Sequence, residues 1–189
     1  GTLTLGGNNS YTGGTTIDCG TLVATRNTLG TGAVVINNGG TLYVADQWVM
    51  CGVNDHGVAE RNIGSLTINA GGTLQFDNVQ GFANGATNLF LNGGLVTGGP
   101  NNSRGDLFLY KGNEQITAGG ATTSTIASVI GVSDNNNTIT VDTGSTLNIT
   151  GLVKNSNWSG SPLTGGFIKA GAGTLTLSEA NTYTGQTNI

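Results

Sequence analysis

The sequence has little charge of either sign and is especially short of basic residues. Charged residues make up 8% of its 189 positions, with 6 Lys and Arg against 10 Asp and Glu. Nucleic-acid binding begins with a basic surface that neutralises phosphate, so this composition argues against a nucleic-acid partner. Scarce Lys and Glu also leave few strong helix formers for surface positions.

Proline and long apolar runs are scarce as well. There are two prolines, and the 34 glycines follow no three-residue period, so the chain is not collagenous. The apolar share of 36% is too high for a disordered linker. No apolar run approaches the roughly 20 residues that span a bilayer, and the first residues show no signal-peptide pattern. We expect ordered β-structure with no membrane span in this segment, and any export signal or anchor outside it.

The cysteine content is low. Cys19 and Cys51 do not form a close metal-ligand cluster. In an oxidising compartment they are candidates for a disulfide, and two free buried thiols are the alternative. We expect no metal, no cofactor and no compact catalytic site in this chain.

The beginning of the sequence recurs at its end. The segments "GTLTLGGNNSYTGGTTI" and "GTLTLSEANTYTGQTNI" agree at 11 of 17 positions without a gap when Gly1 is laid over Gly173, an offset of 172. The second copy stops where the first continues into "DCGTLVAT". The chain is therefore interpreted as a single segment, residues 1–189, of a longer repetitive protein.

A shorter unit of strand, turn and strand also recurs. It appears in "TTIDCGTLVA", "VVINNGGTLYV", "SLTINAGGTLQF", "NLFLNGGLVTG" and "TITVDTGSTLNIT". Asn, Asp and Gly favour the turn because they tolerate the left-handed backbone region. The residues before the turns are spaced 19, 32, 23 and 50 positions apart; they are Ile17, Ile36, Ile68, Leu91 and Val141.

These spacings favour stacked coils over antiparallel hairpins, which the same turn residues would also suit. Most steps fit one coil, with or without an insertion, and the last fits two coils with "TSTIASVIGV" in the unmatched one. We predict an all-β, right-handed parallel β-helix of about eight coils. Ile17, Ile36 and Ile68 form one interior ladder, Leu22, Leu42 and Leu74 form another, and Asn or Thr ladders lie at the corners.

The two end segments resemble a known family. "GAGTLTLSEANTYTGQTNI" and "GTLTLGGNNSYTGGTTIDCGTLVA" are similar to the autotransporter-associated β-strand repeat. The resemblance is close over about 40 residues and loose over about half of the chain. It implies a right-handed β-helical passenger or stalk of a large secreted or surface-displayed bacterial protein, and it carries no catalytic residues.

An irregular insertion at about residues 45–63 departs from that pattern. It gathers the titratable residues Asp46, Asp55, His56 and Glu60. On a β-helix, such an excursion is a place for the acids and bases of a polysaccharide-active enzyme, whose chemistry requires paired carboxylates. A solvated loop with ordinary charges is the alternative, and it is preferred because no catalytic spacing is present.

Two further patterns suggest ligands. "SDNNNTITVD" offers oxygen atoms of the kind that calcium prefers, from Asp134, Asn135, Asn136 and Asp142. Trp158 lies in a polar stretch where an exposed ring would stack on a sugar. Asn-rich corners and a packed loop explain both patterns without a ligand.

The preferred interpretation is a structural rod. We expect a non-enzymatic stalk segment of an extracellular bacterial adhesin or fibre, whose partners are further copies of the same unit, stacked head to tail. Surface glycans are a second candidate partner. The alternatives are a polysaccharide-active enzyme and a carbohydrate-binding module on the same scaffold.

Overall fold

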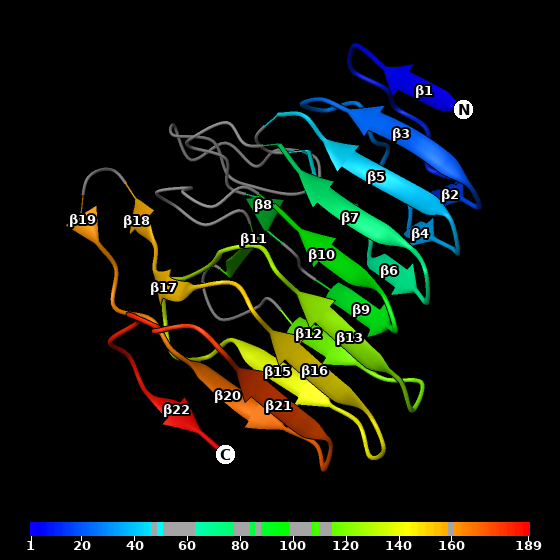
Figure 1. Ribbon diagram of the computed structural model, residues 1–189. Helices are drawn as coiled ribbons and strands as arrows, with labels where there is room; N and C mark the ends of the chain where they lie inside the picture. Colours follow the sequence, from blue (N-terminus) through cyan, green and yellow to red (C-terminus); the bar gives the residue numbers. More distant parts are fainter. Residues whose placement is uncertain are drawn as a thin grey trace.

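The strands of this protein wind into a parallel β-solenoid (Figure 1). The computed structural model describes residues 1–46, 49–50, 63–77, 84–85, 88–98, 107–109, 115–158 and 161–189, with only the backbone for 84–85, 157–158 and 161–162. All regular elements within these ranges are β-strands. The described residues contain no helix long and apolar enough to cross a membrane. The two termini lie at opposite ends of the stack.

Two parallel sheets of eight strands form the long walls of the solenoid. Sheet A consists, in spatial order, of β1 (Thr2–Leu5), β3 (Gly20–Ala24), β5 (Gly40–Val44), β7 (Thr73–Phe76), β10 (Leu95–Thr97), β13 (Thr123–Ile126), β16 (Thr146–Ile149) and β21 (Thr174–Leu177). Sheet B consists of β2 (Thr15–Ile17), β4 (Val34–Ile36), β6 (Leu66–Asn69), β9 (Asn88–Asn92), β12 (Gln115–Ala118), β15 (Thr138–Val141), β20 (Phe167–Ala170) and β22 (Thr187–Asn188).

A third, shorter wall is present in the later coils. It contains β8 (Asn84–Gly85), β11 (Leu107–Leu109), β14 (Ile130–Val132) and β17 (Val153–Asn155), all paired in parallel. One antiparallel hairpin, β18 (Asn157–Trp158) with β19 (Ser161–Pro162), lies outside these three walls. Each later coil therefore passes through the short wall, sheet B and sheet A in turn.

The turn from sheet B to sheet A explains why the Asn-Gly pattern recurs. In the turn between β4 and β5, the Gly40 N–H donates to the Asn37 carbonyl oxygen at 2.9 Å. Gly39 has a φ of 79°, in the left-handed region that glycine adopts without steric cost. The same bond joins Gly72 to the Asn69 carbonyl one coil later. The turns are thus local structures dictated by their own residues.

The predicted apolar ladders are confirmed. Ile17 is the register partner of Ile36, and Ile36 is the partner of Ile68, along sheet B. In sheet A, Leu22 pairs with Leu42 and Leu42 with Leu74. All six side chains are buried. Because parallel pairing brings identical positions of successive coils together, each ladder removes its apolar surface from water on both sides.

The coil between Leu91 and Val141, which lacks the recurring strand-turn-strand sequence, also stacks in the solenoid. Ala118 stands between Leu91 and Val141 in the sheet B ladder, and Gly119 follows it where other coils carry Asn or Asp. The segment "TSTIASVIGV" contributes β13 to this coil and β14 to the next. Of the eight strands in each long sheet, the two edge strands lack a neighbour on one side, which leaves six fully stacked turns. The predicted eight coils are thus a slight overestimate.

Candidate functional site: the two open ends of the solenoid

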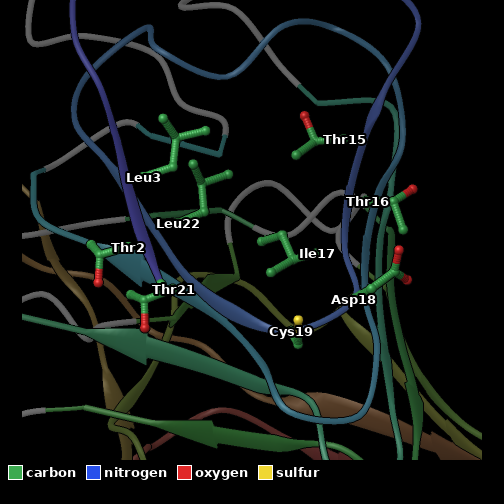
Figure 2. A pocket seen from close by; sticks show the side chains of 10 residues that line it. Thr2, Leu3, Thr15, Thr16, Ile17, Asp18, Cys19, Thr21 and Leu22 are labelled. Carbon is green, nitrogen blue, oxygen red and sulfur yellow. The ribbon is translucent and has the colours of Figure 1, made fainter.

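The N-terminal end of the solenoid opens into an apolar hollow of about 450 Å³ (Figure 2). It lies between β1 and β2, the two edge strands at this end. Leu3, Ile17 and Leu22 project toward one another across it, whereas Thr16 and Asp18 point away from it. Leu3 is 59% exposed, although its register partner Leu22 is buried. The interior ladders therefore reach the surface here.

The C-terminal end is open in the corresponding way. Leu175 and Leu177 of β21 are only partly buried against the core. Ile189, which follows β22, is fully exposed. Edge strands with unpaired backbone groups and apolar side chains are templates for the addition of further chain.

Equivalent positions at the two ends adopt the same local structure. The Tyr11 hydroxyl hydrogen-bonds the Thr15 hydroxyl at 2.8 Å, and the Tyr183 hydroxyl bonds the Thr187 hydroxyl at 2.7 Å. Both pairs are related by the offset of 172 residues. The similarity of the two end segments thus extends from sequence to side-chain geometry.

The aromatic ring at this repeat position packs on the preceding coil. The rings of Tyr183 and Phe167 have centroids 5.5 Å apart and are tilted by 51°. Phe167 is buried, and it pairs with Thr187 through β20 and β22. The C-terminal repeat segment is therefore attached to the coil before it by both backbone pairing and aromatic contact.

A ladder of polar side chains follows the corner between sheets B and A. The Asn92 side-chain amide donates to Asn69 at 3.2 Å, Asn69 donates to Asn37 at 2.7 Å, and Asn37 donates to a carboxylate oxygen of Asp18 at 2.7 Å. All three amides donate toward the N-terminal end. The corner ladder predicted from the Asn-rich turns is confirmed over these four coils.

A small polar hollow of about 220 Å³ lies on the outer face of sheet A. Burial raises the pKa of the Tyr43 hydroxyl above its ordinary 10.0, and a hydrogen bond to Asp77 and the charge of that carboxylate raise it further. The place of Tyr43 in "GTLYV", between two inward residues, marks it as outward-facing, but no sequence motif links it to Asp77. The hollow is lined by Tyr43, Gln75, Phe76, Asp77, Thr97 and Gly98.

The predicted enzyme residues fall mainly outside the described part of the chain. Cys51, Asp55, His56 and Glu60 are not among the described residues, and Asp46 is half-buried. Both ends of the insertion are described: the Ile63 N–H donates to the Met50 carbonyl oxygen at 2.9 Å. The described residues on either side of 51–62 are therefore joined by a backbone hydrogen bond.

The disulfide between Cys19 and Cys51 remains a prediction. Cys19 is exposed in the turn between β2 and β3. Its predicted partner lies outside the described residues, as do Trp48 and the side chain of Trp158.

The calcium candidates are not brought together. Asp134 precedes β15 and accepts a hydrogen bond from the Asn136 N–H at 2.8 Å, whereas Asp142 follows the same strand at the opposite corner. Asn135 accepts from the Gln186 N–H at 2.9 Å. In the described ranges, no group of three or more Asp, Glu, His or Cys residues could hold a metal ion. The Asn-rich stretch is thus explained by turn and inter-coil hydrogen bonds.

Comparison with protein families gives one match, in two places. Residues 1–24 and 167–189 match the family described as the passenger-associated-transport-repeat. Together the matches contain β1, β2, β3, β20, β21 and β22, the strands that build the two open ends. The resemblance to an autotransporter passenger repeat is confirmed for these segments. No curated protein and no solved structure gives a significant match.

Proposed function

We propose that the chain is a rod-forming segment of a secreted or surface-displayed autotransporter passenger. The proposal rests on the match of both ends of the solenoid to the passenger-associated-transport-repeat. In this role the solenoid is a stalk of an adhesin or fibre. Successive units of 172 residues continue one another head to tail, and each unit begins where residues 173–189 of the previous one lie.

The equivalence of β1 and β21 carries this proposal. β21 pairs with β16 on one side, with Leu175 opposite Leu147. β1, at the equivalent repeat position, pairs with β3 on the other side, with Leu3 opposite Leu22. Superposing the two therefore yields one strand with a neighbour on each side. The exposed Leu3 would be covered by the Leu147 of a preceding unit.

The same superposition predicts the length of the unit. β1 and β21 stand at the two ends of an eight-stranded order, so seven strand spacings separate them. With about 4.8 Å between neighbouring strands, one unit adds about 34 Å to the rod. A non-closing contact of this kind gives an unbranched fibre, because nothing returns the last unit to the first.

The proposal is tested with tandem variants in which residue 189 is followed directly by residues 18–189 of a second unit, and then of a third. Small-angle scattering should show rods of constant cross-section whose length grows by about 34 Å with each unit. A matched control lacks Ile189 at the join, because a one-residue shift turns the following side chains to the wrong face. Joined units that scatter as flexibly linked particles, as the control should, would contradict the rod.

A further inference from the structure

The structure specifies which residues meet where one unit continues into the next. β20 pairs with β22 in a register that sets Phe167 opposite Thr187 and Ile168 opposite Asn188. Continued by two residues, this register sets Lys169 opposite Ile189 and Ala170 opposite the residue after it. In a head-to-tail rod that residue is Asp18 of the following unit. This step rests on the proposed function.

Lys169 occupies an unusual position in its strand. Its register partner in the preceding coil is Ile139, which is buried, and Ile139 pairs with the buried Ile116. Lys169 is thus a cation in a row that is otherwise apolar in these coils. Lys169 is half-buried, so its ammonium group gains from hydrogen-bond acceptors at the surface. Its Nζ reaches the corner between β20 and β21, where it donates to the carbonyl oxygens of Ala170 at 2.9 Å and Gly171 at 2.7 Å.

Asp18 has no side-chain N–H with which to continue the corner ladder into the preceding coil. Each Asn of the ladder donates to the coil before it, but a carboxylate at pH 7 only accepts. Asp18 accepts from Asn37, and any further hydrogen bond must come from a donor in the preceding coil. The residue opposite it in the continued register is Ala170, whose methyl group can donate no hydrogen bond. The ammonium of Lys169, with a third N–H, is the donor held at this corner.

We propose that Lys169 of one unit and Asp18 of the next form an ion pair across the join, and that this pair fixes the register of the join. The apolar ladder by itself does not fix the register of the join. In "GTLTL", Leu3 and Leu5 alternate with Thr, so a shift by two residues preserves the apolar face. With only 6 basic residues in the chain, a cation at this corner gives a contact that a shifted register lacks.

The tandem of two units provides its own control, because each residue of the pair occurs once at the join and once at a free end. Lys169→Glu removes the hydrogen bonds to Ala170 and Gly171 in whichever unit it is made. In the first unit it also places two carboxylates at the join, so Tm should fall about 2 °C further than for Lys169→Glu in the second unit, at the free end. Adding Asp18→Lys at the join to the first-unit variant reverses both charges and should remove this difference. The same Asp18→Lys in the first unit should restore nothing.

Salt and scattering complete the test. The difference between the two Lys169→Glu variants should vanish near 1 M salt, where the screening length falls to about 3 Å. Equal effects at the join and at the free end, or no restoration by the charge reversal, would overturn the ion pair while leaving the rod intact. A tandem whose length does not grow by one unit would instead remove the proposed function, and this inference with it.

Discussion

The side-chain amide of Asn69 donates a 2.7 Å hydrogen bond to the side-chain oxygen of Asn37, its counterpart one coil earlier. The two residues are 32 positions apart in sequence, and the insertion lies between them. Parallel pairing of β4 with β6 brings them together. The corner of the solenoid is therefore stabilised by side chains as well as by backbone bonds.

Removing one amide from the middle of this ladder should weaken the whole stack. Asn37→Ala loses a donor to Asp18 and an acceptor for Asn69, so we expect the free energy of unfolding to fall by about 1–3 kcal/mol in urea denaturation. Asn38→Ala, an exposed neighbour in the same turn, is the matched control and should stay within about 0.5 kcal/mol of the unaltered protein. Equal losses for the two variants would show that the ladder contributes nothing.

Truncation of a ladder residue should cost more in an inner coil than in an end coil. Ile68 is completely buried between Ile36 and Leu91, so Ile68→Ala leaves a cavity and should cost about 2–5 kcal/mol. Ile17 pairs with Ile36 on one side only and borders the open hollow, so Ile17→Ala should cost clearly less. The free energy of unfolding of the two variants, measured side by side, decides this. A reversed order would contradict the open N-terminal end.

Two adjacent glycines in one turn should differ in their tolerance of a methyl group. At Gly39 the φ of 79° makes Ala strained, but a Cβ there would meet only the Cβ of Cys19 at 3.9 Å, so Gly39→Ala should cost about 1–2 kcal/mol. At Gly40 a Cβ would overlap the carbonyl oxygen of Ile17, which the backbone cannot move without breaking the sheet. We expect the larger loss for Gly40→Ala. Thermal unfolding followed by circular dichroism compares the two, and equal Tm values would refute the close approach.

Alkaline pH should destabilise the protein through Tyr43. Burial, followed by the bond to Asp77, raises the pKa of Tyr43 in the folded state above its ordinary 10.0. Below pH 10 the hydroxyl is protonated in both states and stability is unaffected. As pH rises from 10 toward the higher folded pKa, the unfolded chain loses the proton first, so the free energy of unfolding falls. Tyr43→Phe should remove this part of the decline, and an unchanged pH profile in that variant would contradict it.

Much of the fold follows from local patterns. The recurring strand, turn and strand predicted the ladders through Ile17 and Leu22 because each turn needs glycine at a positive φ and each strand alternates apolar with polar residues. The insertion at about residues 45–63 stays a prediction, because 47–48 and 51–62 lie outside the described residues. The coil through Ala118 had no recognisable turn, because Ala and Gly replace the larger apolar residue and the Asn found elsewhere. Its place became clear only from its pairing with Leu91 and Val141.

The sequence by itself determined that coils stack, which residues fill their interior and that the two ends are equivalent, since these properties depend on periodicity and on repeated local turn chemistry. The tertiary structure alone decided the short third wall, the neighbourhood of Tyr43 and Asp77, and the inward row in which Lys169 stands opposite Ile139. Those relationships join residues of different coils. They lie outside the ladders that the recurring turn aligns, so the pattern that predicted those ladders did not place them.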